Sequence, residues 1–233
     1  MFRSTARLDE VMQTPLIAQR TPEWFDMRTS KLTGSIIDTV LKTNPYQTVE
    51  KLICEKAGMP SDFHGNEATR HGTQYEAVAV AEYEKRTRRK GLEFGLIAHP
   101  THPRLAYSPD GVSVDPSGQT DPILLEIKCP LRRKITNKVP LYYQHQMNLG
   151  MDVFDLNMTH FVEFKPKEIF GEEAVFQLTE VRRIRGWLEA HTPTIDEFWS
   201  EVDKWKAIGW YKHPTAIRAL EEGRLHEFMQ NWL

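Results

Sequence analysis

Two segments, Leu105-Ala-Tyr-Ser-Pro-Asp-Gly-Val112 and Leu124-Leu-Glu-Ile-Lys-Cys-Pro130, carry most of the structural information in this sequence. The first has the pattern of a short apolar strand that ends in a turn at Asp110. The second has the pattern of a strand in which Glu126 and Lys128 stand two residues apart. Because successive side chains of a strand point to opposite faces, Glu126 and Lys128 share one face. Two carboxylates and one lysine gathered in this way can hold a divalent cation and orient water beside a phosphate.

The same alternation divides the second segment into an apolar face and a mixed face. Alternate residues from Ile123 to Ile127 are expected to face the core, and those from Leu124 to Lys128 the opposite side. A charged pair on one side of an otherwise apolar strand indicates a site. Glu-x-Lys also occurs on solvated strand faces, however, and Ser-Pro-Asp-Gly is an ordinary turn sequence. These two segments alone therefore leave a metal-binding site and an ordinary surface strand equally open.

The composition is that of a globular protein, with 233 residues of which 40% are hydrophobic and 27% charged. No apolar run approaches the roughly 20 residues of a membrane span, so no membrane partner is expected. The first eight residues lack the apolar core of a signal peptide, which predicts a protein of the cytoplasm. Cys54 and Cys129 are too few for an iron–sulfur cluster or a zinc site built mainly on cysteine. Both are expected to be reduced and at least partly buried.

The distribution of charge is more informative than its sum. A net charge of −2 argues mildly against a nucleic-acid partner, but three basic stretches stand out, at residues 85–90, 132–134 and 182–185. The first and third are explained as well by solvated faces as by contact with DNA. The second, Arg132-Arg-Lys134, directly follows the strand that carries Glu126 and Lys128, which favours contact with DNA there.

The chain is expected to form one domain over residues 1–233, because no repeat, low-complexity tract or linker divides it. A helical part covers about 1–90, a sheet core about 91–180 and C-terminal helices about 181–233. The predicted helices are 22–28, 35–40, 48–56, 66–90, 141–149, 181–190 and 194–208, with a last one after Pro214. The predicted strands are 94–98, 104–107, 112–114, 123–128, 154–164 and 174–180. The fold class is therefore α/β, with a mixed sheet flanked by helices on both sides.

Glu76 lies on the apolar stripe of the predicted long helix, in line with Ala79, Val80 and Tyr83. A carboxylate on the buried face of a helix is costly unless a cation or hydrogen-bond donors meet it. Glu76 is therefore a candidate third carboxylate of the site. The alternative is a boundary residue that points past the edge of the core.

Four sets of motifs resemble the lambda exonuclease (YqaJ-like viral recombinase) family of the PD-(D/E)xK nuclease superfamily. In chain order they are Trp24-Phe-Asp-Met-Arg28 with Leu32-Thr-Gly-Ser35, His71-Gly-Thr-Gln-Tyr-Glu76, Ser108-Pro-Asp-Gly111 with Glu126-Ile-Lys-Cys-Pro130, and Gln144-His-Gln146. The resemblance spans about Trp24 to Met147 and keeps the order of the family's motifs. It implies a restriction-endonuclease-like PD-(D/E)xK core.

The resemblance implies a magnesium site of two ions, which Mn²⁺ can also occupy. Asp110 and Glu126 would bind one ion directly, with the backbone carbonyl of Ile127 as a third ligand. Glu76 would bind the second ion directly or through water. Lys128 would hold or help deprotonate the attacking water and offset negative charge in the transition state. In the metal-free protein, Lys128 is instead expected to form a salt bridge with Glu126.

Gln144 has no charge suited to acid–base chemistry, so its amide is assigned a supporting role in orienting water or a phosphate oxygen. The alternative is that Gln144 belongs to a polar helix face packed near the sheet.

The family also has a pocket for the 5′-phosphate of the degraded strand. The resemblance assigns Arg28 and Ser35 to this pocket, with Ser108 and Lys134 as further contacts. Ser35 is predicted to cap a helix N-terminus, where free N–H groups favour an anion.

Two features depart from the family pattern. The family has an aromatic residue three positions before the Gln-x-Gln motif, and that position is Leu141 here, next to Tyr142 and Tyr143. The hairpin between Asp110 and Glu126 is longer, with a turn-rich insertion at residues 115–122. Such an insertion leaves the ends of the paired strands usable.

The resemblance implies a Mg²⁺-dependent exonuclease that digests one strand of linear double-stranded DNA from its 5′ end. It would release mononucleotides and leave a 3′ overhang for viral or phage recombination, in the cytoplasm of the host cell. A single-strand annealing protein is the implied partner, and a ring-shaped homotrimer the implied assembly. One alternative is an endonuclease or repair nuclease of the same superfamily, without an end requirement. A less favoured alternative is a nucleic-acid-binding module that has lost catalysis.

Overall fold

The computed structural model describes residues 2–17, 21–60, 66–136, 138–167 and 173–224. Its contacts divide the chain into two compact units. The first is formed by Met1–Ser35 and Gly65–Arg185, and the second by Ile36–His64 and Gly186–Leu233. The two units therefore interleave along the chain.

Within the described residues, the first unit contains two sheets. The larger has the order β2-β5-β6-β7-β8, and the smaller the order β1-β4-β3. Only β6 and β7 pair in parallel in the larger sheet, and α6 (Leu141–Val153) supplies the crossover that a parallel pair requires. The larger sheet comprises β2 (Lys90–Leu92), β5 (Gly111–Val114), β6 (Ile123–Lys128), β7 (Met158–Lys165) and β8 (Val175–Arg182). The smaller comprises β1 (Leu32–Thr33), β3 (Ile97–Ala98) and β4 (Leu105–Tyr107).

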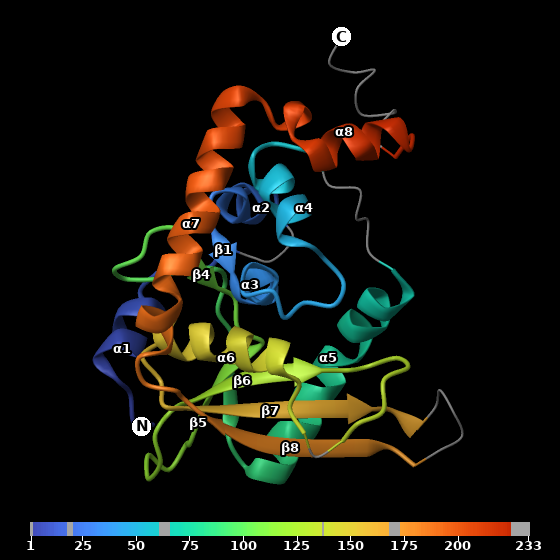
Figure 1. The fold of residues 1–233 in the computed structure, drawn as a ribbon. Helices are drawn as coiled ribbons and strands as arrows, with labels where there is room; N and C mark the ends of the chain where they lie inside the picture. The colour runs from blue at the N-terminus through green and yellow to red at the C-terminus, as the bar shows by residue number, and fades with distance from the viewer. Residues whose placement is uncertain (1, 18–20, 61–65, 137, 168–172, 225–233) are drawn as a thin grey trace. The chain divides into compact units, whose positions relative to one another are not determined.

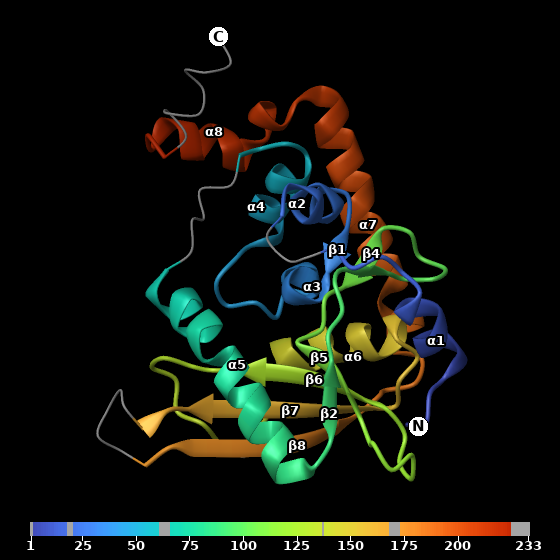
Figure 2. The ribbon, with the colours of Figure 1, turned by 180° about the vertical axis from the view of Figure 1, so that it is seen from behind.

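Helices α5 (Glu67–Thr87) and α6 cover the two faces of the larger sheet (Figures 1 and 2). Leu125 and Ile127 of β6 pack in one hydrophobic cluster with Ala79 and Tyr83 of α5. Leu124 lies against α6 on the opposite face. The predicted division of β6 into two faces is therefore confirmed. Both faces are buried, since helices cover each side of this central strand.

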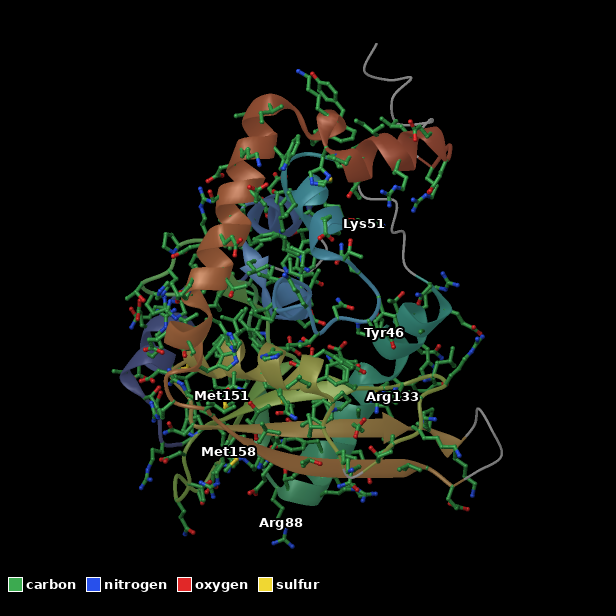
Figure 3. The ribbon with its side chains drawn as sticks, in the orientation of Figure 1. Tyr46, Lys51, Arg88, Arg133, Met151 and Met158 are labelled. Carbon is green, nitrogen blue, oxygen red and sulfur yellow. The ribbon has the colours of Figure 1, made fainter. Side chains whose placement is uncertain are left out.

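Side-chain caps explain where several helices begin. The hydroxyl of Thr21 accepts a hydrogen bond from the Trp24 N–H at the start of α2 (Pro22–Thr29). Asn66 and Thr69 cap each other's backbone N–H groups at the start of α5. The predicted extension of this helix to Lys90 is wrong: Arg88 adopts a left-handed conformation with φ 58°, and Lys90 begins β2. Arg88 points away from the sheet (Figure 3).

Other predicted boundaries also change. The α3 helix (Gly34–Val40) begins one residue early, so Ser35 lies in its first turn and is not its cap. The predicted end of α6 near Gly150 is wrong, because that glycine sits inside the helix at a close packing contact. The predicted helix 181–190 is wrong at its start, because pairing with β7 extends β8 to Arg182. The single helix α7 (Trp187–Ile208) replaces the two predicted there and contains Pro193. Two predicted strands begin later, at Ile97 and Met158.

The second unit is built from helices. Within it, α4 (Val49–Lys56) contacts both α7 and α8 (Pro214–Glu221), and the 3₁₀ helix η2 (Trp210–Lys212) joins α7 to α8. Cys54, Met59, Ala216 and Ala219 form its small buried cluster, against which Trp210 packs. In the first unit, the guanidinium group of Arg7 in α1 (Ala6–Met12) donates hydrogen bonds to backbone carbonyls.

Both cysteines are free and buried, as expected. Across the part of the chain that the structure describes, no helix has the length and apolar character of a membrane span.

Candidate active site

The carboxylate of Glu126 is the centre of a dense set of hydrogen bonds. It lies on the α6 side of β6 and is 1% exposed. Its Oε1 atom accepts hydrogen bonds from Lys128 Nζ and from Gln146 Nε2, the latter at 2.6 Å. Its Oε2 atom accepts one from the Tyr107 hydroxyl. The salt bridge expected between Lys128 and Glu126 in the metal-free protein is confirmed.

Asp110 lies beside Glu126 because of strand pairing. Gly111 pairs with Leu125 in the antiparallel β5–β6 ladder, which brings the turn before β5 next to β6. Asp110 Oδ2 accepts a hydrogen bond from the Ile127 backbone N–H at 2.6 Å. Burial, and then the negative charge of Glu126, raise the pKa of Asp110 well above its usual range. Two carboxylates held this way favour a cation between them.

Lys128 keeps its charge in this environment. Burial alone would lower the pKa of Lys128, but the carboxylates of Glu126 and Asp110 outweigh it and raise the pKa. Its Nζ atom also lies 5.2 Å from the ring centroid of Tyr143, a cation–π distance. A lysine held in the ammonium form is suited to donating hydrogen bonds and stabilising negative charge.

Glu76 lies on α5, partly buried, and its charge contributes to the raised pKa of Asp110. Among the described residues, however, no three His, Cys, Asp or Glu side chains stand close enough to hold one metal ion. Asp110 and Glu126 still fit Mg²⁺, which prefers carboxylate oxygens and keeps several waters. The assignment of Glu76 to a second ion, and of the Ile127 carbonyl to the first, stays a prediction.

The two glutamines of the Gln-x-Gln motif have different partners. Gln144 Nε2 donates to the Val139 carbonyl at 3.0 Å, while Gln146 Nε2 donates to Glu126. Side chains two residues apart on a helix point in different directions, since each residue turns the helix by about 100°. Gln146, for which the sequence predicts no role, is therefore the glutamine that contacts the Glu126 carboxylate.

Arg28 and Ser35 lie together, as predicted for a phosphate pocket. Arg28 Nη2 donates to Ser35 Oγ at 3.0 Å, and its guanidinium carbon lies 4.4 Å from the Trp24 ring centroid. Burial lowers the pKa of Arg28, although an arginine stays charged at any physiological pH. Ser108, assigned to the same pocket, is partly buried directly after β4, and Lys134 is exposed on the segment after β6.

Gly34 links the Arg28–Ser35 pair to the carboxylate centre. A Cβ atom at Gly34 would lie 2.3 Å from the Tyr107 ring and 3.2 Å from Cγ of Gln146. Both of these side chains donate to Glu126. The residue before Ser35 is thus in close contact with the groups that hold the carboxylate.

A second buried ion pair flanks the site. Lys128 and Glu163 are register partners in the parallel β6–β7 pair, and Glu163 is 1% exposed. Arg133 lies on the segment after β6 and is labelled in Figure 3. It donates from Nη2 to Glu163 Oε1 at 2.5 Å. Its guanidinium carbon lies 5.8 Å from the Tyr143 ring centroid, so Tyr143 borders both Arg133 and Lys128.

An Asp at the turn into one strand, a Glu-x-Lys in the antiparallel neighbour and helices on both sheet faces define a PD-(D/E)xK nuclease fold. The chain belongs to the YqaJ-like viral recombinase family, whose model matches residues 23–157.

Solved structures agree with this placement. An alkaline exonuclease from Laribacter hongkongensis superposes with a TM-score of 0.65 at 26% identity, covering 81% of this chain and 95% of that one. Its complex with dAMP gives the same values. A phage-related exonuclease from Haemophilus somnus, at a TM-score of 0.50 and 13% identity over 76% of this chain and 93% of that one, shares the fold. The family and the Laribacter exonuclease indicate a nuclease.

Viral proteins are among the curated relatives. An uncharacterized protein of Acanthamoeba polyphaga mimivirus is 30% identical over 179 residues, which cover 72% of this chain and 33% of that protein. A protein of African swine fever virus is 29% identical over 159 residues, which cover 57% of this chain and 45% of that protein. The chain thus spans about a third to a half of the length of these relatives.

Proposed function

We propose that this protein is a Mg²⁺-dependent exonuclease that digests one strand of duplex DNA from the 5′ end and leaves a 3′ overhang. One observation carries the proposal: the Arg28–Ser35 pair stands next to Gly34, which packs against both Tyr107 and Gln146. An arginine–serine pair so close to the carboxylates of Asp110 and Glu126 is suited to holding a terminal phosphate near the bond to be cut.

Each residue of the carboxylate centre has a separate role in the proposed hydrolysis. Asp110 and Glu126 would hold Mg²⁺, which supplies positive charge against the phosphate oxygens when bound. We infer that Lys128 orients the attacking water and stabilises charge in the transition state, because its raised pKa favours the donor form over a base. Glu76 would support a second ion, and Mn²⁺ would substitute for Mg²⁺.

The remaining assignments concern DNA. Arg28 and Ser35 would bind the 5′-phosphate with Ser108, and Gln144 would orient water or a phosphate oxygen. Lys134, exposed after the catalytic strand, would contact the backbone of the duplex. Release of mononucleotides is supported by the dAMP complex of the Laribacter exonuclease.

The family suggests the setting of this activity. We propose that the overhang serves recombination with a single-strand annealing protein, and that the enzyme assembles as a trimeric ring around DNA. The viral relatives make the cytoplasm of an infected cell the proposed place of action.

The test uses three substrates with Mg²⁺: an end-labelled linear duplex with a 5′-phosphate, the same duplex with a 5′-hydroxyl, and a closed circle. We expect degradation of the phosphorylated duplex to labelled mononucleotides, slower degradation of the hydroxyl form, and an intact circle. Cutting of the circle at the same rate would instead establish the alternative, an endonuclease of the same superfamily. A Lys128→Ala protein as active as the parent would refute the mechanism.

A further inference from the structure

The ring of Tyr107 is clamped between two glycines. A Cβ atom at Gly34 would lie 2.3 Å from one edge of the ring, and a Cβ at Gly150 would lie 2.6 Å from Cζ on another. Real Cβ atoms do not approach this closely, so neither position accepts a side chain while the ring stays where it is. Tyr107 is 1% exposed and belongs to β4, whereas Gly150 belongs to α6. The ring is therefore fixed from both sides.

The fixed ring points its hydroxyl at one oxygen of the carboxylate centre. The Tyr107 hydroxyl donates to Oε2 of Glu126, while Lys128 and Gln146 both donate to Oε1. Lys128 and Gln146 reach this oxygen with long, rotatable side chains. Tyr107 is the donor whose position the backbone determines, since close packing leaves its ring no other place.

We propose that Tyr107 is a positioning residue, which holds the Glu126 carboxylate in the orientation that binds the metal ion. The hydrogen bond from Tyr107 would fix the rotation of the carboxylate, whose two oxygens offer about four lone-pair sites in all. Hydrogen bonds to a ligating carboxylate commonly set its orientation and tune metal affinity. The metal itself rests on the proposed function; the part played by Tyr107 rests on the contacts above.

The matched control is Tyr83, another buried tyrosine with a satisfied hydroxyl. It donates to Ser113 Oγ and contacts His160 Nδ1, each at 2.7 Å, on the α5 side of the sheet. Tyr107→Phe and Tyr83→Phe each remove one buried hydroxyl and keep the ring. A general effect of losing a buried hydrogen bond would appear in both variants, and a metal-specific effect in Tyr107→Phe alone.

The experiment is calorimetric titration of the full-length, DNA-free protein with Mn²⁺, together with the unfolding midpoint in EDTA. We expect Tyr107→Phe to bind Mn²⁺ about tenfold to a hundredfold more weakly than the parent, and Tyr83→Phe to bind as the parent does. In the nuclease assay, Tyr107→Phe should need correspondingly more Mg²⁺ for half-maximal rate and reach a near-parental rate at saturation.

Parental affinity in Tyr107→Phe, or equal losses in both variants, would overturn the proposal. So would a Tyr107→Phe protein that unfolds without metal while Tyr83→Phe stays folded, since the hydroxyl would then be structural. A parent that binds no Mn²⁺ would refute the proposed function itself, which keeps the two failures distinct.

Discussion

Gln146 Nε2 lies 2.6 Å from Glu126 Oε1, so a neutral amide and the Lys128 ammonium share one carboxylate oxygen. Gln144, two residues earlier on the same helix, donates to a backbone carbonyl. The pair offers the same side chain in two environments. A hydrogen bond to a charged group contributes about 1.5–3 kcal/mol, whereas a neutral one contributes about 0.5–1.5 kcal/mol.

Gln146→Ala should therefore weaken Mn²⁺ binding by about tenfold, because Glu126 loses a donor that orients it. Gln144→Ala should leave Mn²⁺ affinity within about twofold of the parent, whatever it does to the use of a 5′-phosphate. Calorimetric titration without DNA measures both. Equal losses in the two variants would contradict the assignment of Gln146 to the carboxylate centre.

Gly150 and Gly72 both lie inside helices, but only Gly150 is in close contact. A Cβ atom at Gly150 would lie 2.6 Å from both Leu124 and Tyr107, while at Gly72 nothing lies within 4 Å. Gly72→Ala should raise the free energy of unfolding by about 0.5–1 kcal/mol, from helix propensity. Gly150→Ala should lower it by about 1–3 kcal/mol, because it overpacks the core. Urea unfolding of both variants tests this, and a stabilised Gly150→Ala would contradict the packing described.

His160 should make stability depend on pH. Its ring contacts the Tyr83 hydroxyl at 2.7 Å, and its Nε2 lies 3.8 Å from Glu180 Oε1. Burial, and then the charge of Arg89, lower the pKa of His160 to about 4, against the opposing charge of Glu180. An unfolded histidine has a pKa of about 6.5, so the unfolded state takes up the proton first as the pH falls.

The contribution of His160 should therefore be constant above about pH 6.5, with a loss of about 3 kcal/mol as the pH falls to about 4. Urea unfolding from about pH 7 to about pH 4 measures the slope, with His160→Gln as the comparison. The variant should lose stability less steeply over this window. Parallel slopes would show that His160 does not carry the effect.

The sequence predicts a helix or strand correctly where local residue patterns alone determine that element. Alternation in residues 123–128 predicted β6 with its bounds, and three predicted helix starts coincide with the side-chain caps at Thr21, Thr48 and Asn66. The sequence did not predict strands that form only because they pair with a strand distant in the chain. The short strands β1 and β2 exist through their partners β4 and β5, and β8 continues to Arg182 through its pairing with β7.

The site residues also fall into those that the sequence predicts and those that depend on tertiary packing. Asp110, Glu126 and Lys128 could be predicted because turn chemistry and a two-residue spacing bring them together. Tyr107 could not, since its contact with Glu126 joins strands of two different sheets. The choice of Gln146 over Gln144 depends on the rotation of α6 about its axis. At Gly150, which the sequence pattern suggested only as a helix end, α6 packs closely against Leu124 and Tyr107.

Arg133 and Arg132 are adjacent, but only Arg133 pairs with a buried acid. Arg133 reaches Glu163, whose side chain is 1% exposed, whereas Arg132 pairs with Glu67 at the surface, with side chains 83% and 67% exposed. Arg133→Ala leaves a buried charge without its partner and should lower the free energy of unfolding by about 3 kcal/mol. Arg132→Ala should change it by less than about 0.5 kcal/mol.

The two arginine variants are compared by urea unfolding in EDTA, so that metal binding does not enter. Adding Glu163→Gln to Arg133→Ala should recover part of the loss, because it removes the unpaired charge. A double variant that is no more stable than Arg133→Ala would mean that Glu163 is not the source of the loss.

Asp110→Asn should raise the stability of the metal-free protein and abolish nuclease activity. Burial and the charge of Glu126 raise the pKa of Asp110, so its ionised form is disfavoured in the fold. A group whose pKa is raised in the fold contributes stability at low pH, and this contribution is lost as the pH rises through that pKa.

At neutral pH in EDTA, Asp110→Asn should therefore be more stable than the parent by about 0.5–2 kcal/mol. The substitution relieves the repulsion between the two carboxylates, and the Asn side chain can still accept a hydrogen bond from the Ile127 N–H. In the proposed function Asp110 holds Mg²⁺, so saturating Mg²⁺ should stabilise the parent but not the variant. Nuclease activity of the variant should be lost. A variant less stable than the parent in EDTA would show that the carboxylates do not oppose each other in the metal-free fold.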